Sequence, residues 1–169
     1  MILQTERLVL REYVPEDFEG LREIISDPET MRFYAHPYDD AGVRRWLDWS
    51  MENYRTFGFG LWAMCLREDG RFIGDCGITI QNIHGVYRPE IGYHVHKAHW
   101  NRGYATEAAR ACRDWAFEHT PFRLLFSYMN AENLASRAVA EKNGMRWLED
   151  YPEKGIPHSV YCTPDDARR

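Results

Sequence analysis

Residues 90–109 contain the stretch that decides the fold. Glu90–His96 reads Glu-Ile-Gly-Tyr-His-Val-His, and Trp100–Ala109 reads Trp-Asn-Arg-Gly-Tyr-Ala-Thr-Glu-Ala-Ala. The first run alternates as a strand does, and the second is a glycine-containing turn that leads into an alanine-rich amphipathic helix. The first N–H groups of a helix have no partner inside the helix, and the helix dipole adds positive charge there. The pattern therefore predicts a binding site for a phosphate or pyrophosphate near Arg102–Thr106.

The composition is that of a soluble globular protein. The chain has 169 residues, 44% of them hydrophobic and 28% charged, which predicts one domain, residues 1–169, with a sizeable core. A formal net charge of −5 disfavours a non-specific nucleic-acid binder. No run approaches the roughly 20 apolar residues that a membrane span needs, and Met1–Arg7 does not resemble a signal peptide. We therefore expect a cytoplasmic protein with no nucleic-acid and no membrane partner.

Hydrophobic periodicity and turn residues divide the chain into strands and helices. The predicted strands are Leu8–Val14, Leu61–Leu66, Phe72–Gln81, Glu90–His96, Arg123–Met129, Met145–Asp150 and Ile156–Cys162. The predicted helices run from Pro15 through Ile25, briefly from Asp27, from a cap at Asp39 or Asp40 to Gly58, from about Tyr104 to His119, and from Asn133 to Asn143 before Gly144. Strands in series followed by strand–helix alternation indicate an α+β (mixed α/β) domain around one sheet.

Several short motifs occur in an order that resembles a known family. They are Thr5-Glu-Arg-Leu-Val-Leu-Arg11, Ile73-Gly74 with Gly77, Glu90-Ile-Gly-Tyr93, Trp100–Glu107, Asn130-x-x-Asn133-x-x-Ser136 and Glu141–Met145. In this order the chain resembles the GNAT acetyl-CoA-dependent N-acetyltransferases, and among them the branch that acetylates ribosomal-protein N-termini. The resemblance implies the GNAT fold: a single central, mostly antiparallel sheet with splayed central strands, flanked by helices.

The resemblance also implies acetyl-CoA as co-substrate and a set of residues that bind it. The pantetheine arm would lie along the backbone of His94, Val95 and His96, and Asn133 would hydrogen-bond to it. The pyrophosphate would bind the backbone N–H groups of Arg102, Gly103, Tyr104, Ala105 and Thr106.

Two residues are candidates for catalysis. Glu90 lies at the strand end before the cofactor stretch, where a carboxylate could deprotonate an amine through water; alternatively it is a solvated charge or pairs with Arg88. Ser136 lies one helical turn after Asn133 and would sit near the cofactor sulfur. Many relatives carry a general-acid tyrosine at the position of Ala140, so we expect Ser136 to position the sulfur or relay a proton.

The resemblance implies acetyl transfer to a primary amine by direct attack in a ternary complex. The acceptor is a protein N-terminus or a small molecule, and the sequence does not choose between them. A protein α-amine, with a pKa of about 8, needs less help from a base than a lysine amine at about 10.4. Aromatic residues of the early helices, namely Phe33, Tyr34, Tyr38 and Tyr54, could wall the acceptor site, although each is more typical of core packing. The resemblance allows a homodimer, for which the sequence marks no interface.

Two other functions remain open. The chain could be a non-catalytic CoA-binding or regulatory module, which Ala140 in place of a tyrosine favours. His94 and His96 have a spacing that can ligate zinc or iron. Because no acidic third ligand stands at a familiar offset, and because the widely spaced Cys65, Cys76, Cys112 and Cys162 look like buried apolar residues, we expect no metal.

Overall fold

The computed structural model describes residues 1–164 as one eight-stranded sheet with helices on both faces. The strands are β1 (Leu3–Gln4), β2 (Leu8–Arg11), β3 (Leu61–Leu66), β4 (Phe72–Ile83), β5 (Val86–Val95), β6 (Phe126–Asn130), β7 (Arg146–Glu153) and β8 (Ile156–Cys162). The helices are α1 (Phe18–Ile25), α2 (Asp40–Phe57), α3 (Tyr104–His119) and α4 (Leu134–Lys142), with short 3-10 turns at Pro15–Asp17 and Lys97–His99. None of the helices in residues 1–164 is long and apolar enough to cross a membrane.

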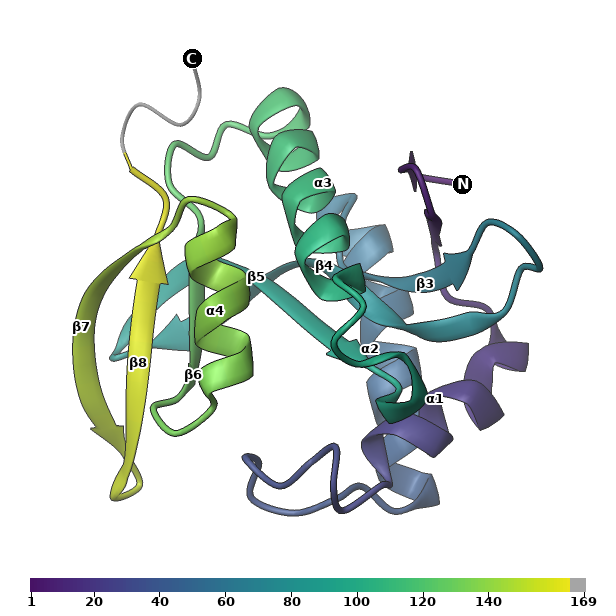
Figure 1. The fold of residues 1–169 in the computed structure, drawn as a ribbon, viewed down its shortest axis with the longest axis horizontal. Helices are drawn as coiled ribbons and strands as arrows, with labels where there is room; N and C mark the ends of the chain where they lie inside the picture. Colours follow the sequence, from purple (N-terminus) through teal and green to yellow (C-terminus); the bar gives the residue numbers. More distant parts are fainter. Residues whose placement is uncertain (165–169) are drawn as a thin grey trace.

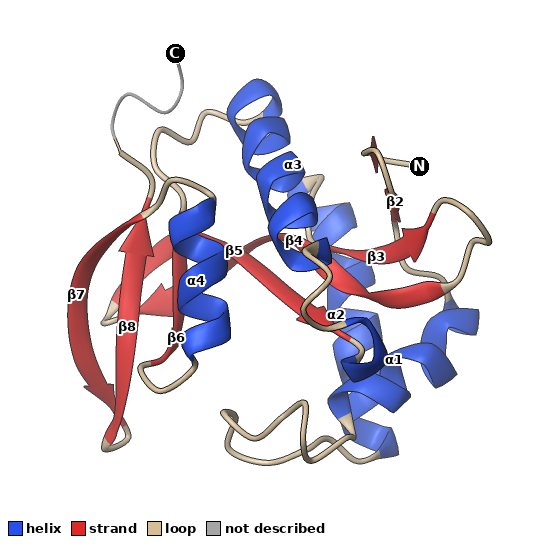
Figure 2. Cartoon of the chain, viewed as in Figure 1, coloured by secondary structure: helices blue, strands red, loops and turns tan. Residues whose placement is uncertain are grey.

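The sheet order is β1-β2-β3-β4-β5-β6-β8-β7, and β5–β6 is its single parallel pairing within the described residues. Helices α3 and α4 lie in front of the sheet in Figures 1 and 2, and α1 and α2 lie behind it. Strand β3 is covered from both sides, and all six of its residues are buried, which is why it reads as a continuous apolar run rather than as an alternating one. The predicted mostly antiparallel sheet flanked by helices is confirmed.

Local capping signals placed the long helices correctly. Asp39 is the N-cap of α2, where its side chain accepts a 2.7 Å hydrogen bond from the Gly42 N–H. Gly58 ends that helix at a φ of +77°, the left-handed conformation that favours glycine. Asn133 caps α4 in the same way as Asp39, accepting from the Ser136 N–H at 3.1 Å. Caps act over three residues, so a sequence reveals them directly.

The short helix predicted at Asp27 is wrong. Residues 28–33 form turns, and the Asp27 carboxylate accepts from the N–H and the hydroxyl of Thr30, both at 2.8 Å. A Lys97 ammonium 2.8 Å away also binds Asp27, and Met31 is fully buried against α1 and α2. These long-range anchors hold the segment in turns although its first residue resembles a helix cap.

Strand boundaries differ from the predictions at several places. The strand predicted from Arg123 begins at Phe126, and β4 and β7 continue to Ile83 and Glu153. The strand predicted at Leu8–Val14 ends at Arg11, and β1 was not predicted. Strand β5 begins at Val86 rather than Glu90, because β4 and β5 form one long hairpin that closes at His84 and Gly85. Both turn residues have positive φ, +51° and +80°. A His-Gly pair is a weaker hairpin signal than the Asn-Gly or Asp-Gly pairs that usually supply this conformation.

We predict that Gly77→Ala destabilises the sheet at the contact between β4 and the residue before β3. A Cβ at this position would lie 1.9 Å from the Gly60 carbonyl oxygen and 2.9 Å from the Leu61 Cα. Because both obstacles are backbone atoms, the strands must separate, and we expect the free energy of unfolding to fall by about 1–3 kcal/mol or more. Urea denaturation measures this change.

The matched control is Gly155→Asn in the β7–β8 turn. Gly155 has a φ of +82° and open space around its Cβ position, and asparagine adopts positive φ readily. We expect this variant to stay within about 0.5 kcal/mol of the wild type. Equal stabilities of the Gly77→Ala variant and the wild type would show that the close approach at Gly60 does not exist.

Candidate active site

The site lies where β5 and β6 diverge. These parallel strands share one register pair, Glu90 with Phe126, whereas β4 and β5 pair from Val86 through Val95. The Ser127 hydroxyl donates to the Ile91 carbonyl at 2.9 Å and is a further tie between the two strands. Beyond it, no other strand among residues 1–164 pairs with this edge of β5, and Figure 1 shows β5 running away from β6. The divergence opens the sheet to both helical layers.

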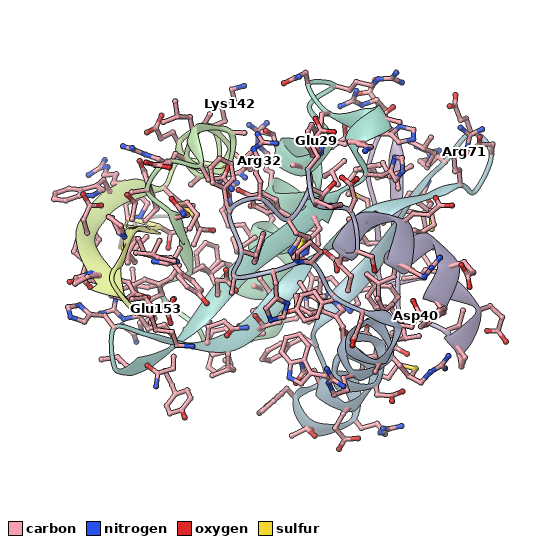
Figure 3. The ribbon with its side chains drawn as sticks, turned by 90° about the horizontal axis from the view of Figure 1, so that it is seen from below. Glu29, Arg32, Asp40, Arg71, Lys142 and Glu153 are labelled. Atoms are coloured by element: carbon pink, nitrogen blue, oxygen red, sulfur yellow. The ribbon has the colours of Figure 1, made fainter. Side chains whose placement is uncertain are left out.

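A cavity of about 460 Å³ lies between the starts of α3 and α4 and the end of β5; we call it the α3–α4 cavity. Its lining includes seven of the residues predicted to bind the cofactor: His94, Val95, Gly103, Tyr104, Ala105, Thr106 and Asn133. Predicted residues His96 and Arg102 lie outside this lining. Two cations, Arg32 and Lys142, lie on its walls, and Figure 3 shows them on the same side of the molecule. The cavity therefore presents positive charge to whatever it holds.

The first turn of α3 offers unpartnered N–H groups to this cavity. The first α-helical hydrogen bond at this end runs from the Glu107 N–H to the Gly103 carbonyl. The N–H groups of Tyr104, Ala105 and Thr106 therefore have no partner inside the helix. Gly103 has a φ of +81° and no side chain that could cap these groups. The helix start lies where the turn and helix pattern predicted it, and the binding of an anion there stays a prediction.

Thr5 and Arg7, which lie between β1 and β2, hold this turn by hydrogen bonds. Glu107 accepts hydrogen bonds from the Thr5 hydroxyl at 2.6 Å and from the Arg7 guanidinium Nε at 2.7 Å. Arg7 in turn donates to the Arg102 carbonyl at 2.8 Å, and its guanidinium lies 4.5 Å from the centre of the Tyr104 ring. Glu107 is thus a structural anchor as well as a charge that suits the helix dipole.

At the end of β5, one backbone edge bonds to β4 and the other faces the gap between β5 and β6. The His96 N–H donates to Ile73 of β4 at 2.8 Å. Strand alternation then directs the Val95 N–H to the opposite edge, toward the α3–α4 cavity. The Trp100 indole donates to the Val95 carbonyl at 2.7 Å. This bond gives a structural reason for the tryptophan at the start of the Trp100–Glu107 motif.

Tyr93 supplies a hydroxyl that the sequence-based reasoning missed. Its hydroxyl lies 2.8 Å from the Ser136 hydroxyl and donates to the Ser136 carbonyl at 3.0 Å. Burial raises the pKa of Tyr93 above its ordinary value, and the bond to Ser136 lowers it in part. Ala140 is buried in the core. The phenol of this site therefore comes from β5 rather than from α4.

A second cavity of about 390 Å³ lies on the α2 side of the divergence; we call it the aromatic cavity. The aromatic residues that line it are Phe33, Tyr34, Tyr38, Trp46, Trp49, Tyr93 and Tyr128. Tyr54, the remaining candidate for this wall, instead binds the Leu61 carbonyl through its hydroxyl and packs in the core. Two carboxylates, Glu90 and Glu153, also line the aromatic cavity, together with the cation Lys154. Figure 3 shows Glu153 well away from Arg32 and Lys142.

Glu90 is held in the aromatic cavity and does not pair with Arg88. Its carboxylate accepts from the Thr79 hydroxyl at 3.2 Å, and Arg88 lies beside Glu149 at 3.6 Å. Burial raises the pKa of Glu90 to about 7, more than Thr79 and His94 lower it. A carboxylate with this pKa can exchange protons near neutral pH, as a general base must.

His94 and His96 do not face a common ligand. The Nδ1 atom of His94 lies 2.9 Å from the Asp75 carboxylate, and the Nδ1 atom of His96 accepts from the Ala98 N–H at 3.2 Å. Within residues 1–164 no three His, Cys, Asp or Glu side chains are grouped so as to hold a metal ion. The buried Asp75 was not predicted, because a pairing between two strands leaves no local pattern in a sequence.

We predict that the raised pKa of Glu90 makes the protein less stable as the pH rises. Below about pH 4.5, the ordinary pKa, the carboxyl group is protonated in the folded and the unfolded state alike. Between pH 4.5 and about 7 the unfolded state releases the proton and the folded state keeps it, so the free energy of unfolding falls. Above pH 7 this loss is complete.

Urea denaturation of the wild type and of Glu90→Gln over this pH range isolates the effect. The difference in unfolding free energy between the two proteins should change between pH 4.5 and 7 in favour of the variant. Glu132→Gln, at an exposed position before α4, is the control and should follow the wild type. Parallel curves for the wild type and Glu90→Gln would contradict the assignment.

Comparison with known proteins identifies the family. A family model described as an acetyltransferase (GNAT) domain matches residues 7–146. The uncharacterised protein YkkB of Bacillus subtilis is 36% identical over 160 residues, which cover 94% of this chain and 93% of YkkB.

Solved structures agree with this match. An acetyltransferase from Agrobacterium tumefaciens superposes with a TM-score of 0.83 at 35% identity, over 96% of this chain and 93% of its own. RimL, a ribosomal L7/L12 alpha-N-protein acetyltransferase solved in complex with coenzyme A, superposes with a TM-score of 0.79 over 98% of both chains. At 15% identity RimL shows the shared fold alone. The resemblance to the GNAT acetyltransferases is confirmed, and the chain belongs to the GNAT family of acetyl-CoA-dependent acetyltransferases.

Proposed function

We propose that this protein transfers the acetyl group of acetyl-CoA to a primary amine by direct attack in a ternary complex. The observation that carries the proposal is that two cavities meet at the divergence of β5 and β6. The residues common to both linings are Phe33, Tyr34, Tyr93, His94, Asn133 and Ser136. Acetyl donor and amine can therefore enter from different sides and meet at these residues, as attack within one complex requires.

The α3–α4 cavity fits acetyl-CoA. Its free N–H groups at Tyr104, Ala105 and Thr106 suit a pyrophosphate, and Arg32 and Lys142 add the charge that an anionic cofactor needs. The outward edge at Val95 suits the amides of a pantetheine arm. RimL, which has the same fold, was solved with coenzyme A. The Asn133 side chain uses its oxygen as the α4 cap, which leaves its NH₂ group for the cofactor.

The aromatic cavity fits a primary amine whose pKa lies near 8. Glu90 lies in this cavity, and its pKa of about 7 is suited to take a proton, through water, from an α-amine of pKa about 8. A lysine amine near 10.4 holds its proton too strongly for such a base. A protein N-terminus and a small amine of similar pKa both meet this requirement.

The reacting atoms meet groups that can polarise the carbonyl and hold the sulfur. The Val95 N–H faces the position where the thioester oxygen gains negative charge. The Ser136 hydroxyl can donate a hydrogen bond to the departing thiolate. The Tyr93 hydroxyl, 2.8 Å away, can join it by turning its hydrogen away from the Ser136 carbonyl. Because Tyr93 supplies a phenol, the alanine at position 140 no longer favours a non-catalytic module.

Incubation with acetyl-CoA and a panel of amines tests the function. The panel holds peptides with free N-termini, small primary amines and N-terminally blocked peptides with one lysine. Thiol release and mass spectrometry follow the reaction. Near neutral pH we expect α-amines to react about 10²-fold faster than lysine, which matches their larger neutral fraction. Absence of transfer to every amine, with coenzyme A bound normally, would refute the proposed function.

We predict that Gly103→Trp weakens coenzyme A binding. Gly103 opens the first turn of α3 at positive φ and lines the α3–α4 cavity, so an indole there would occupy space that the pyrophosphate needs. Titration calorimetry should show a Kd at least about 10-fold higher than in the wild type, equivalent to about 1.4 kcal/mol.

Gly155→Trp is the matched control, because Gly155 has a similar φ of +82° and lies in the β7–β8 turn with nothing near its Cβ position. Normal affinity in this control together with weak affinity in Gly103→Trp supports the site. Unchanged affinity in Gly103→Trp would place the pyrophosphate elsewhere.

A further inference from the structure

His94 carries a buried ring nitrogen without a partner. Its side chain is 8% exposed, and its Nδ1 atom lies 2.9 Å from the Asp75 carboxylate. Because a carboxylate can only accept, Nδ1 carries the hydrogen of the neutral ring and Nε2 carries the lone pair. The Nε2 atom is buried and has no hydrogen-bond partner among the described residues. Such an atom needs an explanation, since buried polar groups are normally paired.

Asp75 is built to hold this ring in one orientation. Its Oδ1 atom accepts from the His94 backbone N–H at 3.0 Å as well as from the ring. Its Oδ2 atom accepts from the Tyr13 hydroxyl at 2.9 Å and from the Trp46 indole at 3.4 Å. Four donors converge on the two oxygens of this fully buried carboxylate. Strand β4 therefore fixes both the tautomer and the direction of His94.

His94 lies at the junction of the two cavities, and Glu90 does not. His94 lines the α3–α4 cavity and the aromatic cavity, whereas Glu90 lines the aromatic cavity alone. The two residues share a face of β5 with Gly92 between them, and the Glu90 carboxylate leans over the position where a Gly92 Cβ would be, 3.4 Å away. The two groups therefore differ in what they can reach. Glu90 can act on an amine in the aromatic cavity, whereas His94 can act on a group at the junction of the two cavities.

We propose that His94 is a second catalytic residue, held by Asp75, that removes the proton which the nitrogen loses after it attacks the thioester. This inference rests on the proposed function. An ammonium acceptor must lose two protons to become an amide. Glu90 takes the first through water and passes it to solvent, which frees the lone pair for attack.

The second proton leaves once the bond between nitrogen and the carbonyl carbon has formed. His94 Nε2 takes it from the positively charged nitrogen, the carbon–sulfur bond breaks, and the bond electrons go to sulfur. His94 then gives its proton to that thiolate, held by the Ser136 and Tyr93 hydroxyls. The products are an amide and free coenzyme A thiol, one proton has gone to solvent, and the ring is neutral again.

The groups around His94 set its proton affinity. Burial lowers the pKa of His94, and the carboxylates of Asp75 on β4 and Glu90 on β5 raise it by more, so it lies above its ordinary value. From the other elements, the ring of Tyr34 in the loop before α2 lies 5.4 Å away, and that of Trp46 on α2 lies 5.3 Å away. Neither of these two rings carries a charge near neutral pH. The neutral ring that can accept a proton is therefore lost as the pH falls.

Two acceptor substrates distinguish the role of Glu90 from that of His94. An alkylamine needs both proton transfers, whereas an alkoxyamine with the same carbon skeleton is already neutral and needs only the second. His94→Gln should lower kcat by about 10²-fold or more with the alkylamine and by at least about 10-fold with the alkoxyamine, within the range of general-base catalysis. Glu90→Gln should be impaired with the alkylamine and stay within about 3-fold of the wild type with the alkoxyamine.

Controls show that the fold and the donor site are intact. His119→Gln, at an exposed position at the end of α3, should keep wild-type rates with both acceptors. The melting temperature and the coenzyme A affinity of each variant check folding and donor binding. His94→Gln and Glu90→Gln with the same ratio of alkylamine to alkoxyamine rates would overturn the separate role of His94.

The wild type and Asp75→Asn test the same idea without removing the histidine. With the alkoxyamine, the kcat of the wild type and of Glu90→Gln should fall as the pH drops, because His94 becomes protonated. Asp75→Asn should move this fall to lower pH, since the carboxylate that raises the pKa of His94 is gone, and should lower the plateau, since an amide can donate to Nδ1 and reverse the tautomer. A pH-independent kcat with the alkoxyamine in the wild type would refute the proposal. Failure of the wild type to acetylate any amine would instead refute the proposed function.

Discussion

The whole site depends on one failure of pairing, the separation of β5 from β6. A parallel pair normally satisfies the backbone of both strands, but here register pairing is limited to Glu90 and Phe126. Two consequences follow from the same gap. The end of β5 has backbone groups left for a ligand, and the sheet no longer separates the helical layers. The α3–α4 cavity and the aromatic cavity therefore share lining residues, which a continuous sheet would prevent.

The charged side chains are divided between the two cavities in the same way. Arg32 and Lys142 line the α3–α4 cavity, while Glu90 and Glu153 line the aromatic cavity, where Lys154 offsets part of their charge. The formal net charge of −5 says nothing about this arrangement, because steering depends on where charges lie and not on their sum. Under the proposed function, this division would draw a polyanionic cofactor to the α3–α4 cavity, where Arg32 and Lys142 lie.

Sequence reasoning succeeded where the signal is local. The start of α3, the caps at Asp39 and Asn133 and the stop at Gly58 all act within one helical turn, and each was predicted correctly. It failed at the turns after Asp27, because Lys97, 70 positions further along the chain, holds that aspartate. For the same reason it listed His94 for its backbone and missed Asp75: their hydrogen bond joins residues 19 positions apart. Cofactor contacts made by the backbone were thus easier to propose than chemistry made by side chains.

The position of the phenol illustrates how the same chemistry can come from different elements. What acetyl transfer needs is a hydroxyl near the sulfur, and the chain element that carries it is immaterial. Here α4 has Ala140 packed in the core, while β5 contributes Tyr93, whose hydroxyl lies 2.8 Å from that of Ser136. The Tyr93 side chain reaches α4 directly from β5. A strand residue thus places a phenol beside α4, where the resemblance led us to look for a helix residue.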